Sequence, residues 1–188
     1  MSDIQNWINQ IDRNTTEFQK AFGELSPDEL NRKPNPNTWS IAQNIDHLIV
    51  INSSYFSIFK EMRDGNYELP FVAKIGFIVN LFGRLILNAV KPETKRKIKT
   101  LSKWEPSESE ISPDILERFK KHQEELKQEI IDSKDLLSRN AIISSPANKY
   151  IVYHLKTAFD IIIAHEQRHL NQALEVKSQF PETKNASA

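Results

Sequence analysis

The chain has 188 residues, of which 39% are hydrophobic and 27% are charged, and this length suits a single domain with a sizeable core. Cysteine is absent, which excludes disulfides and thiolate metal ligands, so any metal site must use histidine and carboxylates. Lys+Arg and Asp+Glu balance at 25 each, which gives no global electrostatic preference for nucleic acid.

The N-terminal residues do not show a basic region followed by an apolar core, so we predict no secretory signal and a cytoplasmic location. A local basic run covers residues 91–99. We interpret this run as a solvated loop rather than a phosphate-binding patch, and we expect no nucleic-acid partner.

Apolar residues recur every three or four positions from the start of the chain, which predicts an amphipathic helix over about 3–24. The series is Ile4, Trp7, Ile8, Ile11, Phe18, Phe22 and Leu25. The following Ser26-Pro27-Asp28-Glu29 combines an N-cap serine with proline at the first helical position and glutamate at the third. That combination predicts a short second helix, which a loop from Asn31 to Pro36 ends.

A second capping box occurs in Trp39-Ser40-Ile41-Ala42-Gln43 and predicts a long helix from Ser40 to about Met62. His47 lies about 120° from the apolar seam of this helix, at the margin of its apolar face. From there it could reach a neighbouring helix as a ligand, or it could be a partly exposed structural residue.

Residues 71–90 are rich in apolar side chains, but Lys74, Asn80, Arg84 and Asn88 interrupt them. A membrane-spanning helix needs about 20 mostly apolar residues with few or no charges. We therefore predict an amphipathic helix or an irregular insertion that covers the core, and no integral membrane segment. Contact with a membrane surface or a partner protein is the alternative.

Ser112-Pro113-Asp114 opens the next predicted helix, on which His122 faces inward. His122 is either a competing metal ligand or a hydrogen-bonded core residue. A polar tract at residues 144–148 then leads into the last predicted helix, over about 149–179. His154 would lie three turns from His165, about 16 Å along the axis, so we interpret it as structural.

Two histidines of the last predicted helix, His165 and His169, are four residues apart. On a helix their Cβ atoms lie about 5–6 Å apart on one face. They also fall in the apolar stripe of that helix, where an unpaired buried polar nitrogen costs roughly 1–3 kcal/mol. A shared metal ion would satisfy both rings.

The same five residues, 165–169, match the H-E-x-x-H pattern of zinc proteases. The extended form of that signature needs glycine and a further histidine where this chain has Gln172 and Glu175. We therefore do not favour a protease, and any third metal ligand must come from upstream.

Four long helical patterns without a convincing strand predict an all-α fold, an antiparallel four-helix bundle with extra short helices. Two motifs coincide in it: Trp39 to Gln43 followed by Asp46-His47-Leu48, and residues 165–172 in the last helix. This pairing resembles the DinB-like (DinB/YfiT-like) superfamily of four-helix metalloproteins. The resemblance covers residues 1–180 as one domain and leaves 181–188 as a polar tail.

The resemblance implies a divalent-metal site, zinc or nickel, with His47, His165 and His169 as ligands and coordination positions open to water or substrate. Three protein ligands plus an open position is the catalytic zinc pattern. Gln43 and Gln172 are expected as outer donors. Glu166, next to His165, is expected to be the catalytic proton acceptor, or alternatively a hydrogen-bonding or rim residue.

By the same resemblance, we expect a thiol-dependent S-transferase or a metal-dependent hydrolase acting on a small molecule, with a low-molecular-weight thiol as cosubstrate of the transferase. A homodimer is compatible with this expectation. The alternative is a non-enzymatic, stress-associated binding or structural bundle whose metal only joins helices. A closed fourth coordination position, filled by His122 or a carboxylate, would favour that alternative.

Overall fold

A computed structural model of the chain describes residues 3–94, 100–107 and 110–180. The expected polar tail at 181–188 and most of the basic run at 91–99 lie outside these residues.

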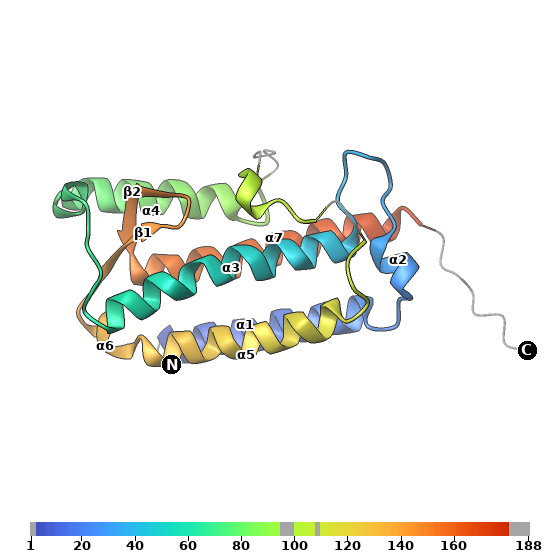
Figure 1. Cartoon of the computed structure of the whole chain (residues 1–188), viewed down its shortest axis with the longest axis horizontal. Helices are drawn as coiled ribbons and strands as arrows, with labels where there is room; N and C mark the ends of the chain where they lie inside the picture. Colours follow the sequence, from blue (N-terminus) through green and yellow to red (C-terminus); the bar gives the residue numbers. More distant parts are fainter. Residues whose placement is uncertain (1–2, 95–99, 108–109, 181–188) are drawn as a thin grey trace, which may run out of the picture.

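Four long helices form the bundle, and the all-α prediction is confirmed. In Figure 1, α1 and α5 lie together on one side of the molecule, α3 and α7 lie in the middle, and α4 (Gly76–Val90) lies on the opposite side. The long helices are α1 (Asp3–Phe22), α3 (Ile41–Arg63), α5 (Ile115–Asp132) and α7 (Leu155–Ser178), and the short ones are α2 (Pro27–Asn31) and α6 (Lys134–Ser138).

The start of α3 is fixed by the predicted capping box. The hydroxyl of Ser40 accepts a hydrogen bond from the backbone N–H of Gln43 at 3.0 Å, and the Gln43 side-chain oxygen accepts one from the Ser40 N–H at 3.1 Å. These bonds satisfy two backbone donors that a helix start leaves free. They also fix the position of His47, about two turns into the helix.

A two-stranded hairpin precedes α7, and here the expectation of no strand was wrong. Strand β1 (Ile142–Ser145) pairs antiparallel with β2 (Asn148–His154). The last helix therefore begins at Leu155 instead of about 149. The buried hydroxyls of Tyr55 and Tyr153 lie 2.8 Å apart and join α3 to β2.

Residues 71–90 contain the 3₁₀ turn η1 (Phe71–Lys74) and the helix α4 (Gly76–Val90). Helix α4 packs on β2 and α7, as predicted for an amphipathic helix that covers the core. The approach is close at Gly83, where a Cβ would lie 3.2 Å from side-chain atoms of Thr157 and Tyr153. Its outer face exposes an apolar stripe of Phe77, Leu81 and Leu85.

No helix in the described part of the chain is long and apolar enough to cross a membrane. The bundle core consists of two clusters of buried side chains. One is built around Trp7, Phe59 and Phe159, and the other around Phe18, Ile45 and Phe119.

Candidate metal centre

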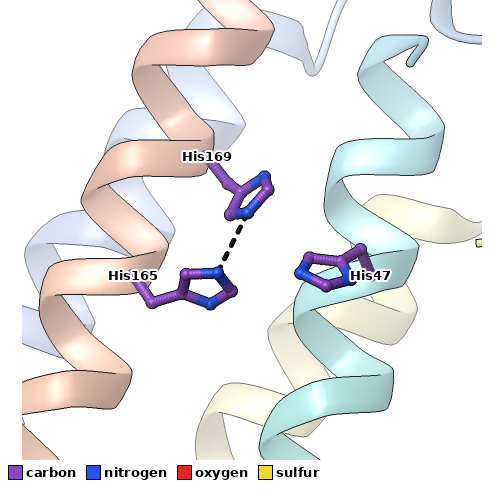
Figure 2. Close-up of side chains that lie close together, drawn as sticks. All are labelled: His47, His165 and His169. Atoms are coloured by element: carbon purple, nitrogen blue, oxygen red, sulfur yellow. Dashed lines mark hydrogen bonds between the residues drawn. The ribbon is translucent and has the colours of Figure 1, made fainter. Parts of the chain in front are cut away.

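Three histidines from two helices meet in the middle of the bundle, and we call them the histidine triad: His47 on α3, and His165 and His169 on α7. Figure 2 shows the His47 ring facing the other two across the gap between the helices. One ring nitrogen of each lies within 4.8 Å of those of the other two. The Nε2 atoms of His165 and His169 are 3.1 Å apart, close to the roughly 3.3 Å that two nitrogens on a tetrahedral zinc ion require.

The far nitrogens of two triad members are held by acceptors on the protein. The Nδ1–H of His47 donates to the carbonyl oxygen of Trp104 at 2.6 Å, and the Nδ1–H of His169 donates to Oδ1 of Asn44 at 2.8 Å. The Asn44 amide is itself oriented, because its Nδ2 donates to Ser40 O at 2.8 Å. With the proton on Nδ1, the lone pair of Nε2 is available to bind a metal ion. Proteins commonly orient metal-binding histidines by such a hydrogen bond from the other ring nitrogen.

The turn that contains Trp104 and the ring of Trp39 lie against the triad. The 3₁₀ turn η2 (Ser102–Trp104) supplies the Trp104 carbonyl. The Trp39 ring lies 4.9 Å from the His47 ring and 5.9 Å from the His169 ring, between centroids. His47 is only 2% exposed, so the alternative of a partly exposed residue was wrong. The turn and the Trp39 ring close the side of α3 that helix periodicity alone leaves open to solvent.

The triad lines a cavity of about 700 Å³. This volume is in the range of small-molecule sites, about 300–1,000 Å³. In the described residues, the group of potential metal ligands consists of the three histidines alone, with no fourth histidine or carboxylate. Three ligands beside a cavity leave room for a further ligand on the ion.

The environment keeps the triad imidazoles neutral, which is the form that binds metal. Burial, followed by the nearby His47 and Arg168, lowers the pKa of His165 to about 3. Burial also lowers the pKa of His169 well below its usual value and lowers that of His47. Arg168 lines the same cavity and donates from Nη1 to Ala89 O at 3.0 Å.

The carboxyl group of Glu166 lies in the core and is fully buried. It accepts hydrogen bonds from the amide groups of Asn14, Asn52 and Gln123, at 3.1, 2.9 and 2.9 Å. Burial raises its pKa to about 7, although the three amide donors act in the opposite direction. Glu166 is not among the residues that line the cavity, and this environment favours its hydrogen-bonding alternative.

The other expected residues have mixed positions. Gln172 lines the cavity. Gln43 serves the capping box and donates to Ser107 O at 2.8 Å, whereas Asn44, its neighbour, is the residue that orients His169.

His154 is the last residue of β2 and therefore not a helical residue. Its Nδ1 lies 3.4 Å from Asn140 O.

His122 is buried on α5 and stacks on Phe56, with ring centroids 5.2 Å apart. It is not part of the triad group. Its Nε2 has no hydrogen-bond partner among the described residues. His122 is therefore a core residue, as expected, but Nε2 lacks the expected hydrogen bond. Burial lowers the pKa of His122 to about 4.

Replacing His122 with leucine is expected to stabilise the protein at pH 5 and to leave metal binding unchanged. Because its pKa is lower in the folded state than in the unfolded state, His122 costs stability as pH falls below about 6.5. At pH 5 this cost is about 2 kcal/mol. Urea unfolding of both proteins at pH 5 and pH 8 measures the effect, and a variant that is equally destabilised at both values would refute it.

The family model of the DinB superfamily matches residues 10–173, a range that contains the whole triad. No match was found among curated proteins or among solved structures.

Proposed function

We propose that this chain, which belongs to the DinB superfamily, is a divalent-metal-dependent enzyme acting on a small molecule. His47, His165 and His169 are the ligands, and zinc or nickel is the ion. The observation that carries the proposal is the orientation of the triad. Two of its rings donate Nδ1–H to fixed acceptors, so their Nε2 atoms point to one place beside a cavity of about 700 Å³.

The donor set fits such an ion, since imidazole is a preferred ligand of both zinc and nickel. When bound, the ion lowers the pKa of a water or thiol in its open position and polarises a substrate. Asn44 and the Trp104 carbonyl hold the rings in place. The Trp39 and Trp104 side chains line the cavity and reduce contact with bulk water, which strengthens electrostatic interactions.

Arg168 supplies the positive charge of the cavity. Its guanidinium lines the space next to the triad, where it favours a substrate or a transition state with negative charge. Both proposed reactions have a negatively charged transition state, because an anionic nucleophile attacks a neutral electrophile. The nucleophile is a thiolate in S-transfer and a hydroxide in the hydrolysis of an ester or amide.

A bundle in which the metal only joins α3 and α7 is the second reading of the triad. It would be favoured by a fourth protein ligand that closes the coordination sphere. The described residues provide none, and the cavity beside the triad supports the enzyme.

The test compares metal-stripped protein with protein loaded with zinc or nickel, purified without a histidine tag. Small thiols with 1-chloro-2,4-dinitrobenzene report S-transfer, and a panel of esters and lactones reports hydrolysis. We expect turnover in at least one assay only with metal, its loss in His169→Ala, and its retention in His154→Ala. Equal rates in stripped and loaded protein would contradict the proposal.

A further inference from the structure

The cavity follows α7, and its lining changes character on the two sides of the triad. Ile161 and Ile162 precede His165 by one turn, whereas Gln172, Glu175, Val176 and Gln179 follow His169. The triad therefore lies between an apolar end and a mainly polar end of one cavity.

The apolar end is enclosed by three helices. Its walls are Ile51 and Tyr55 of α3, Ile86 of α4, and Ile161 and Ile162 of α7. Helix α4 lies alongside α7 in Figure 1 and packs on it, which brings Ile86 over this end.

Two polar side chains at the apolar end, those of Tyr55 and Asn52, are engaged within the protein. The Tyr55 hydroxyl is paired with the Tyr153 hydroxyl at 2.8 Å. Asn52, which also lines the cavity, donates its Nδ2 to Glu166 at 2.9 Å. A ligand there meets mainly hydrocarbon, and burying it is favourable in proportion to its apolar area.

The opposite end presents side chains that hydrogen-bond. Asn37 and Thr38, from the loop before α3, line it together with Gln172, Glu175 and Gln179 of α7. A polar part of a ligand can exchange its water for these groups, which an alkyl or aryl group cannot do.

We propose that the apolar end, formed by Ile51, Tyr55, Ile86, Ile161 and Ile162, is a subsite for an alkyl or aryl portion of the substrate. The polar portion then extends past the triad toward Gln172 and Glu175. This inference rests on the proposed function, because both use the same metal centre. It adds the substrate class: a molecule with a hydrocarbon body on one side of its reacting group and a polar body on the other.

The probes are straight-chain hydroxamic acids, from acetohydroxamic acid to octanohydroxamic acid. Their hydroxamate group binds zinc by its two oxygens and leaves the alkyl chain free to enter the subsite. Isothermal titration of zinc-loaded protein gives the affinity of each probe. We expect the affinity to rise roughly fourfold per added methylene, the factor that corresponds to about 0.8 kcal/mol, until the subsite is filled.

Two matched substitutions on adjacent residues of α4 locate the effect. Ile86→Asn places an amide in the subsite wall, whereas Leu85→Asn makes the same kind of change on the outer face, where Leu85 is 54% exposed. We expect Ile86→Asn to weaken octanohydroxamic acid about tenfold and to leave acetohydroxamic acid unchanged. Leu85→Asn should change neither. If Ile86→Asn does not fold, Ile51→Asn tests the opposite wall.

The outcomes separate the two proposals. Binding of acetohydroxamic acid without a gain on lengthening the chain would overturn the subsite and leave the metal-dependent function standing. Equal losses in the Leu85 and Ile86 variants would also overturn it. Protein that takes up neither zinc nor nickel would remove the proposed function and, with it, the subsite.

Discussion

Replacing His169 with alanine is expected to abolish stoichiometric metal binding, and His165→Ala is expected to do the same. Each change removes an Nε2 donor from a pair whose two atoms lie 3.1 Å apart. Loss of an outer hydrogen-bond partner alone costs about 10–100-fold in metal affinity, and we expect loss of a direct ligand to cost more. Metal analysis after dialysis, together with a competitive zinc indicator, measures both the amount bound and the affinity.

Two histidines outside the triad are the controls. His122→Ala and His154→Ala should retain full metal occupancy, because neither residue belongs to the group whose nitrogens converge. Asn44→Ala is the intermediate case, since it leaves all three ligands but removes the acceptor of His169 Nδ1–H. Full occupancy in His169→Ala would rule out the assignment of the site.

Replacing Glu166 with alanine is expected to unfold most of the protein. Its carboxylate accepts a hydrogen bond from one residue of each of the other long helices, Asn14, Asn52 and Gln123. Without it, three buried amide groups lose their acceptor at roughly 1–3 kcal/mol each. The sum is comparable with the total stability of a domain, about 5–15 kcal/mol.

Urea unfolding followed by circular dichroism measures this loss, with Glu175→Ala as the matched control. Glu175 is a glutamate of the same helix with an exposed side chain, so its replacement should change the free energy of unfolding by no more than about 0.5 kcal/mol. A Glu166→Ala protein as stable as the Glu175→Ala protein would show that the buried carboxylate does not hold the four helices together.

The sequence predicted those parts of the fold that depend on a repeating pattern or on a motif of a few neighbouring residues. The capping box at Ser40 predicted the start of α3, and the i, i+4 spacing of His165 and His169 predicted two neighbouring rings on one face. Both features depend on residues within one or two turns of each other, so a helix is sufficient to define their geometry.

The hairpin before α7 was missed because its first strand is half polar. Ser144 and Ser145 lie in β1 and resemble a loop in sequence. The second strand carries the signal that was available: Tyr150, Ile151, Val152 and Tyr153 are consecutive aromatic and β-branched residues, which favour a strand.

The surroundings of the triad could not be predicted, because they depend on contacts between distant segments. His47 is held by a carbonyl 57 residues further along the chain, at Trp104, and no periodicity connects the two. The bonds that hold Glu166 also join distant segments. The signal that was available in the sequence is Asn52, an amide within the apolar seam of the helix, because a buried amide needs a polar partner.

X-ray absorption spectroscopy of the metal-loaded protein tests the three-histidine centre most directly, because it counts imidazole ligands and gives their distances. We predict three imidazole nitrogens, at about 2.0–2.1 Å if the metal is zinc, together with an oxygen ligand from solvent. In His47→Ala the count should fall to two and the affinity should drop. Two imidazoles in the parent protein, or an unchanged count of three in His47→Ala, would contradict a site built from His47, His165 and His169.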